Sequence, residues 1–255
     1  MKPMRKIGIL AEKGSRIFDW QLTRKALSQA EVELVFFVEI PTNRPRRYLH
    51  KLPARVLWQV ICTVEGLWFG KMANFHPPLD ATKLNCEFQG FRKTFSNEAL
   101  EAIRCSGVDL ILRLGGRGIY SDPVLEAAPL GMISIHHGDN RTFRGGPPGF
   151  WEILNDAPRV GFIVQQLTPK LDGGHVLARG NFKTRRFATE NRSRLFAEAD
   201  RELAQVVGRI VKTGRLPDPE PSEQLGPIYR MPGIWDLVRY LKTSWLRRRP
   251  EIAAE

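Results

Sequence analysis

The chain has 255 residues and a mass of 29.1 kDa; 42% of its residues are hydrophobic, 26% are charged, and its net charge is +12. This size and composition suit one globular domain with or without a terminal piece, and they exclude a multi-domain assembly or a chain disordered throughout. The three cysteines, Cys62, Cys86 and Cys105, lie far apart, so neither a disulfide framework nor a thiolate zinc site is expected. Because no apolar run reaches the roughly 20 residues of a transmembrane helix and no signal peptide is recognisable, we expect a soluble, cytoplasmic protein.

The positive charge is concentrated toward the two ends of the chain. Residues 1–60 carry 12 basic and 5 acidic side chains, residues 61–180 carry 12 of each, and residues 181–255 carry 15 and 10. The basic clusters are Arg44, Arg46, Arg47, Lys51 and Arg55, and the run Arg247, Arg248 and Arg249. Such clusters could meet RNA, an anionic membrane surface or a phosphorylated metabolite, because each offers phosphate charge. A solvated basic surface without a partner is the alternative.

The first 136 residues alternate predicted strands and helices. Short apolar and β-branched runs predict strands at residues 6–10, 33–39, 109–114 and 131–136. Helical patterns lie between them at residues 17–30 and after Ser96. This order predicts an α/β fold with a doubly wound, mostly parallel sheet. No GxGxxG motif follows the first strand, so a dinucleotide-binding loop is not expected.

Three further segments have helical patterns. Residues 48–70 are apolar with a basic start, for which burial is the first expectation and a substrate-facing or membrane-facing element the alternative. Residues 189–213 are closed by Gly214 and followed by a proline-rich linker at 216–221. Residues 234–246 place apolar side chains at helical spacing just before the arginine run, which suggests peripheral membrane contact through residues 234–249.

Two motifs carry the candidate chemistry. The predicted strand that ends in His136 opens into a Gly/Pro-rich loop, which places an imidazole at the carboxyl edge of a parallel sheet, where open α/β folds build their sites. The later motif, LDGGHVL at residues 171–177, contains glycines that let the backbone turn and bring Asp172 into a cleft. The alternative for each residue is structural: a hydrogen-bonded histidine and an aspartate that fixes a turn.

Together these motifs resemble those of the folate-dependent formyltransferases, which include the methionyl-tRNA, glycinamide ribonucleotide and sugar N-formyltransferases. The family pattern is roughly N-x-H-x-S-L-L-P-x-x-R-G-x-x-P-x-x-W, followed by G-V-T-I-x-x-M-D-x-G-L-D-x-G-x-I-L. The positions of this chain that fall on it are His136, Arg144, Gly145, Trp151, Gly161, Leu171, Asp172, Gly174 and Leu177. Two departures are Ser134 in place of the family's asparagine and residues 138–141 in place of S-L-L-P.

The resemblance covers about residues 1–180 and implies a Rossmann-like fold. It implies a formyltransferase-like catalytic domain at residues 1–182, with a helical C-terminal extension at residues 183–255. The implied reaction is transfer of a formyl group from 10-formyl-tetrahydrofolate to a primary amine. Such a transfer passes through an oxyanion and requires protons to move, so it needs a hydrogen-bond donor and a proton shuttle.

The resemblance also implies roles for individual residues. His136 would stabilise the oxyanion or move protons, Asp172 would orient the imidazole and assist transfer through a water, and Ser134 stands where the asparagine polarises the formyl oxygen. The wall that receives the pterin would consist of Arg113, Leu114, Gly116, Gly118, Ile119 and Tyr120, with Asp172 beside it. The substrate contacts would be Arg144, Gly145, Asn140 and His137.

We expect the acceptor to be an amino sugar, since the sequence of residues 183–255 does not resemble the RNA-binding barrel of methionyl-tRNA formyltransferases. Transfer RNA is therefore a weaker expectation as substrate. The alternatives are a folate-binding protein that has lost transfer activity, a 10-formyl-tetrahydrofolate hydrolase and a methionyl-tRNA formyltransferase. A zinc site of His136, His137, Asp139 and His175 lacks the usual ligand spacing, and no metal is expected.

Overall fold

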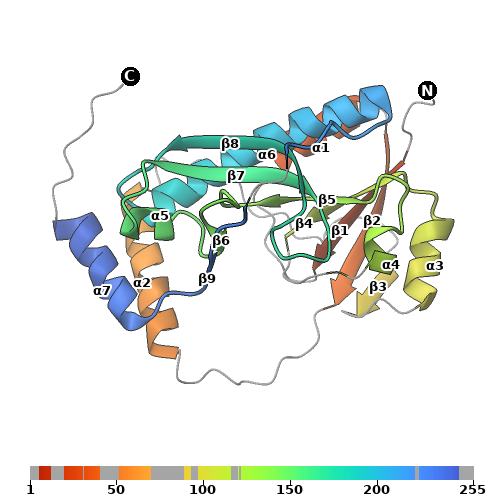
Figure 1. The fold of residues 1–255 in the computed structure, drawn as a ribbon. Coiled ribbons are helices and arrows are strands. Elements are labelled where there is room, and N and C mark those ends of the chain that lie inside the picture. The colour runs from red at the N-terminus through yellow and green to blue at the C-terminus, as the bar shows by residue number, and fades with distance from the viewer. Residues whose placement is uncertain are drawn as a thin grey trace.

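The central feature of the fold is a seven-stranded sheet with the order β3-β2-β1-β4-β5-β7-β8 (Figure 1). The computed structural model describes residues 6–12, 20–30, 32–40, 52–69, 89–92, 97–115, 120, 122–221 and 224–246. The strands of the main sheet are β1 (Lys6–Glu12), β2 (Glu33–Ile40), β3 (Gln89–Arg92), β4 (Leu110–Leu114), β5 (Met132–His136), β7 (Arg159–Gln166) and β8 (His175–Lys183). A separate pair consists of β6 (Arg144–Gly145) and β9 (Ile228–Tyr229).

The sheet is parallel from β3 to β5 and antiparallel beyond it. Strand β1 pairs in parallel with both β2 and β4, and β4 pairs in parallel with β5. Strand β7 then runs antiparallel to both β5 and β8. Because the chain moves outward from β1 first on one side and then on the other, the sheet is doubly wound, as the sequence predicted.

Helices cover the sheet on both sides. They are α1 (Gln21–Gln29), α2 (Leu52–Phe69), α3 (Asn97–Cys105), α4 (Asp122–Leu125), α5 (Trp151–Leu154), α6 (Ala188–Thr213) and α7 (Ile234–Leu241), the last continued by a π-helical turn at Lys242–Leu246. The side chains of α3 and α4 share one hydrophobic cluster with β4 and β5. Those of α1 and α6 share another with β1 and β4. In the described part of the chain, no helix is long and apolar enough to cross a membrane.

Helix α6 belongs to the main core. Its buried side chains Leu203, Val206 and Ile210 pack in the same cluster as Ile7 of β1. The carboxylate of Asp200, also on α6, accepts hydrogen bonds from the main-chain N–H groups at the start of α1, at 2.8 and 3.1 Å. The hydrophobic core therefore crosses residue 182, where the sequence analysis expected a domain boundary.

The apolar side of α7 is used inside the protein. Leu237 and Tyr240 are fully buried in a cluster with α2 and α5, and α2 lies beside α7 in Figure 1. The stripe that the sequence analysis expected to meet lipid is thus mostly occupied, because packing against these helices removes it from solvent. The large apolar side chains of this helix that stay exposed are Ile234 and Trp235, while residues 247–249 lie outside the described residues.

The apolar helix expected at residues 48–70 is α2, and it is buried on one side alone. Ala54 and Ile61 pack inward, whereas Val56, Val60 and Leu67 are among the exposed apolar side chains of the opposite side. The burial expected for this segment therefore holds for one face of the helix.

A buried polar network locks α2, α6 and α7 together. The fully buried Glu65 carboxylate of α2 accepts hydrogen bonds from the Tyr240 hydroxyl and from the main-chain N–H of Thr189, the latter at 2.9 Å. The same hydroxyl accepts a hydrogen bond from the main-chain N–H of Ala188 at 2.8 Å. Burial and the neighbouring Glu65 raise the pKa of Tyr240, so this hydroxyl stays protonated and keeps donating.

Removing that hydroxyl should destabilise the protein. We expect Tyr240→Phe to lower the free energy of unfolding by about 2 kcal/mol, because it leaves a buried carboxylate and a buried N–H without this partner. Urea unfolding measures the effect. The matched control, Tyr229→Phe, removes a hydroxyl outside the network on β9 and should change stability by less than about 0.5 kcal/mol. Equal effects in the two variants would contradict the assignment of this network.

Candidate functional site

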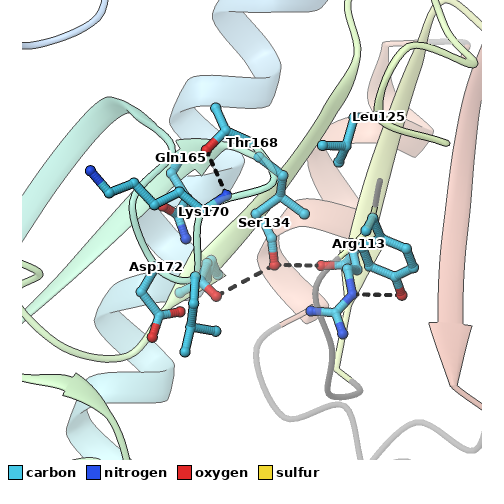
Figure 2. A pocket seen from close by; sticks show the side chains of 11 residues that line it. Arg113, Leu125, Ser134, Gln165, Thr168, Lys170 and Asp172 are labelled. Atoms are coloured by element: carbon cyan, nitrogen blue, oxygen red, sulfur yellow. Dashed lines mark hydrogen bonds between the residues drawn. The ribbon is translucent and has the colours of Figure 1, made fainter. Parts of the chain in front are cut away.

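The candidate site is a small cavity of about 50 Å³, partly open to solvent, at the carboxyl ends of β4 and β5 (Figure 2). This edge of the sheet is where doubly wound folds bind ligands. Its lining residues come from β4, β5, β7, α4, the segment between β4 and α4, and the loop that follows β7: Arg113, Tyr120, Leu125, Ser134, Ile135, Gln165, Leu167, Thr168, Lys170, Leu171 and Asp172. Seven of these eleven residues carry a polar or charged group and four are leucine or isoleucine, so a bound small molecule would meet several hydrogen-bonding groups.

The structure brings His136 and Asp172 together, as the sequence analysis expected. Nδ1 of His136 lies 3.3 Å from Oδ1 of Asp172. The other carboxylate oxygen of Asp172 accepts a hydrogen bond from the main-chain N–H of Gly145 at 3.1 Å. Asp172 has φ +49°, a left-handed conformation that aspartate tolerates better than most residues. The sharp turn at residues 171–174 therefore aims this carboxylate at the histidine.

His136 is buried at the end of β5 and lies behind the cavity. Its side chain is 8% exposed, and it is not among the residues that line the cavity. Burial lowers the pKa of His136, although Asp172 and the carbonyl of Phe143 pull it the other way. Both ring nitrogens face acceptors, Nδ1 the carboxylate of Asp172 and Nε2 the carbonyl of Phe143, and a neutral ring can donate to only one of them.

The backbone around His136 leaves space for glycine alone at residue 138. Nε2 of His136 lies 3.2 Å from the carbonyl oxygen of Phe143. A Cβ atom on Gly138 would lie 2.4 Å from that oxygen and 2.8 Å from Nε2. This close approach explains why residue 138 is glycine in this chain, whereas the motif that it resembles has serine at this position.

Ser134 lies on β5 and its hydroxyl is engaged by main-chain groups. Its Oγ lies 3.1 Å from the carbonyl oxygen of Arg113 and 3.4 Å from that of Ile135. Both neighbours are acceptors, and a serine hydroxyl has one proton. That proton is therefore directed to the main chain.

Arg113 places its guanidinium in the wall of the cavity, held by Tyr120 (Figure 2). Its Nε donates to the Tyr120 hydroxyl at 2.9 Å, and the guanidinium lies 5.0 Å from the centre of that ring. Its Nη2 is buried and has no hydrogen-bond partner within the described residues. Leu114, next on β4, is buried in the core. The other expected pterin-side residues, Gly116, Gly118 and Ile119, lie outside the described residues.

Two of the expected substrate contacts instead support the loops around Asp172. Arg144 donates from Nε to the carbonyl of Gly226 at 2.8 Å and from Nη1 to that of Leu171 at 3.0 Å. Asn140 is buried and donates to the main-chain carbonyl of Asp172 at 3.4 Å. Neither residue is among those that line the cavity. Both therefore position the loop that carries Asp172.

Gly145 and His137 have different surroundings. Gly145 has φ +84°, and a Cβ there would lie 2.1 Å from the carbonyl oxygen of Tyr229, so glycine is required where its N–H reaches Asp172. The ring of His137 packs edge-on against Phe196 of α6, with ring centres 4.7 Å apart. His137 thus lies on the α6 side of β5 and is not among the cavity-lining residues.

Sequence reasoning missed several residues that build the site. Arg179 of β8 joins two loops, because it pairs with Asp139 at 2.6 Å and donates to Asn140 at 3.2 Å in one, and pairs with Glu220 at 2.9 Å in the other. No motif signals this arginine, since its partners are distant in the chain. Lys170 could have been found, because it directly precedes the LDGG motif. Among the described residues, no group of three histidine, cysteine or acidic side chains is placed to hold a metal ion.

No family model matches the chain. A search of curated proteins finds the methionyl-tRNA formyltransferase of Desulfotalea psychrophila (strain LSv54 / DSM 12343), 32% identical over 87 residues, which are 34% of this chain and 27% of that protein. The chain thus matches about a quarter of the length of this relative.

Solved structures of formyltransferases share the fold over nearly the whole chain. A sugar N-formyltransferase from Shewanella sp FDAARGOS_354 has a TM-score of 0.55 at 12% identity, covering 93% of this chain and 88% of that one. WlaRD, a sugar 3N-formyl transferase studied in the presence of dTDP and 5-N-formyl-THF, has a TM-score of 0.55 at 11% identity, covering 89% and 70%. In the matching segment the chain is similar to methionyl-tRNA formyltransferases, and over nearly its whole length it shares the fold of the solved formyltransferases.

Proposed function

We propose that this protein transfers a formyl group from 10-formyl-tetrahydrofolate to the primary amine of a small molecule, an amino sugar. The observation that carries the proposal is the His136–Asp172 pair beside a cavity at the carboxyl edge of β4 and β5. The surrounding fold is that of proteins whose names include sugar N-formyltransferases. The lining suits the chemistry of a reduced pterin, because leucine and isoleucine side chains stand beside polar groups that can bond the ring nitrogens and oxygen, and Nη2 of Arg113 is a buried donor without a protein partner in the described chain.

The reaction needs one nucleophilic attack and one proton relay. The amine nitrogen attacks the formyl carbon, and the π electrons of the C=O bond move to its oxygen. When the C=O bond forms again, the bond from carbon to N10 of the folate breaks. N10 keeps the electron pair and takes up a proton, and the former amine loses one. The products are a formamide and tetrahydrofolate.

Asp172 is the group of the pair that meets the substrate. It lines the cavity, whereas His136 contacts it from behind. In our proposal the carboxylate carries the proton from the amine toward N10 through a water molecule. His136 fixes the carboxylate and balances its charge as the proton moves. Arg144, Asn140 and Gly145 hold the loops in place for this step.

The amine acceptor is inferred from the neighbours in fold. The sugar N-formyltransferase from Shewanella covers 93% of this chain, which favours an amino sugar. The curated relatives are methionyl-tRNA formyltransferases, which favour tRNA as the second candidate, and the net charge of +12 is compatible with it. A hydrolase and a folate-binding protein without turnover use the same cavity, so an assay must separate all four.

An assay with 10-formyl-tetrahydrofolate distinguishes these functions. We expect tetrahydrofolate to form when a nucleotide-linked amino sugar is present, with a formamide as the second product. Both products are measured by mass spectrometry. Formate released without any acceptor would mean hydrolysis, and transfer to methionyl-tRNA would replace the sugar. Folate binding without turnover against any acceptor would refute the enzyme proposal.

A further inference from the structure

The two side chains that the resemblance places at the oxyanion of formyl transfer, Ser134 and His136, do not direct a donor into the cavity. Ser134 is one candidate by position, but its only hydroxyl proton is directed to the main-chain carbonyls of Arg113 and Ile135. His136 is another, but its nitrogens face Asp172 and the carbonyl of Phe143, and its ring is not among the cavity-lining residues. An oxyanion in a buried site requires a donor that is already in place.

Arg113 supplies a donor in the right part of the cavity. It lies on β4 directly beside Ser134 of β5 in the strand register. The Tyr120 hydroxyl holds its Nε, so the planar guanidinium has a fixed orientation. Its Nη2 is buried and has no partner within the described residues. A buried N–H without an acceptor is costly, and an anionic ligand oxygen would satisfy it.

We propose that the Arg113 guanidinium donates through Nη2 to the formyl oxygen and stabilises the oxyanion in place of a side-chain amide. The inference rests on the proposed formyl transfer, and the bonds that form and break are those of that reaction. The neighbouring Ser134 then has a structural role, because its hydroxyl bonds β5 to the carbonyl of Arg113 on β4. Guanidinium is permanently charged, so this stabilisation is present at every working pH.

Besides Tyr120 and Thr168, whose hydroxyls bond Arg113 and the carbonyl of Gly173, two other polar side chains of the cavity are competing donors. Gln165 is buried, and its amide oxygen accepts from the main-chain N–H of Gly174 at 3.0 Å, which orients the carboxamide. Lys170 is exposed, so its ammonium is hydrated and flexible. Substituting each of them in parallel makes them controls for the proposal.

The test compares kcat, KM and tetrahydrofolate affinity across single variants. For Arg113→Met we expect kcat to fall about 30-fold, with KM and the tetrahydrofolate Kd changed less than about threefold, because the donor acts on the transition state. Ser134→Ala, Gln165→Leu and Lys170→Met should each lower kcat less than Arg113→Met does, and Arg104→Met, at an exposed arginine of α3 outside the cavity lining, should keep kcat within about threefold. Low millimolar guanidinium should partly restore Arg113→Ala, and methylammonium should restore it less, since it cannot mimic the planar fork.

The outcomes separate this inference from the function on which it rests. If the wild type transfers formyl groups and Arg113→Met keeps its kcat, the inference is wrong and the function stands. The same holds if Gln165→Leu or Lys170→Met loses kcat while Arg113→Met does not. If the wild type transfers to no amine, both fail. Should Arg113→Met unfold, Arg113→Lys serves instead; it retains the charge, and about a tenfold loss of kcat at unchanged Tm is expected.

Discussion

Asp172→Asn should lower the rate of formyl transfer at least ~100-fold while the fold and tetrahydrofolate binding persist. One oxygen of the carboxylate lies 3.3 Å from Nδ1 of His136, and the other accepts a hydrogen bond from the N–H of Gly145. An asparagine amide has one oxygen, so it cannot offer an acceptor to both neighbours, and it cannot carry the proton. Asparagine tolerates the φ of +49° at this position, so the backbone turn should be preserved. Single-turnover rates with 10-formyl-tetrahydrofolate and the identified amine measure the effect.

A second aspartate in the left-handed backbone conformation provides the matched control for this substitution. Asp156 has φ +50° and lies in the loop that follows α5. It is not among the residues lining the cavity. Asp156→Asn makes the same chemical change in the same backbone conformation, so its rate should stay within about twofold of the wild type. Wild-type rates in both variants would remove Asp172 from the mechanism.

His136→Ala should reduce the rate as much as Asp172→Asn, because the imidazole supports the carboxylate. Effects of residues that act as a unit are not additive, so the double variant should be little worse than either single one. Burial lowers the pKa of His136 from 6.5, so any loss of activity from its protonation should appear below pH 6.5. A loss of activity centred above that pH would contradict the assignment to His136.

Sequence patterns predicted the parallel half of the sheet because each strand there is a short apolar run between charged or glycine-rich segments. The burial of Ile7, Leu110 and Met132 follows from those runs. The pair His136 and Asp172 was also predictable, because each residue lies at a sharp change from apolar to glycine-rich sequence. The carboxyl edge of the sheet then brings the two segments together.

The placement of α6 could not be read from the change of composition after residue 182. Its buried side chains Leu195, Leu203 and Ile210 form a regular helical stripe, but a stripe does not reveal which surface covers it. The side-chain role of Arg113 was likewise hidden. It depends on Tyr120, seven residues later, and on Ser134 of the neighbouring strand, and this arrangement exists only after the sheet has formed.

A buried carboxyl group beside the site loop should make stability depend on pH. Glu152 of α5 is 2% exposed, and its Oε2 has no hydrogen-bond partner in the described part of the protein. Burial raises the pKa of Glu152 to about 7 from 4.5, although main-chain N–H groups of Gly149 and Glu152 partly oppose it. The folded state therefore holds this proton up to about neutral pH, whereas the unfolded chain releases it near pH 4.5.

The sign of the pH effect follows from this order of the two pKa values. Below pH 4.5 the Glu152 carboxyl is protonated in both the folded and the unfolded state, so its ionisation does not lower the free energy of unfolding. As the pH rises from 4.5 toward 7, the carboxyl group ionises in the unfolded chain but not in the folded protein. Ionisation lowers the free energy of the unfolded state alone, so the free energy of unfolding falls. Above pH 7 the loss is complete at about 3 kcal/mol.

Glu152→Gln removes this titration. The free energy of unfolding of the variant minus that of the wild type should therefore rise by about 3 kcal/mol between pH 4.5 and pH 8. Urea unfolding at several pH values measures the difference between the two proteins. Glu101→Gln on the exposed side of α3 is the matched control, and its difference from wild type should stay flat across the same range. Parallel pH profiles for wild type and Glu152→Gln would mean that the buried carboxyl ionises in the folded protein as easily as in the unfolded chain.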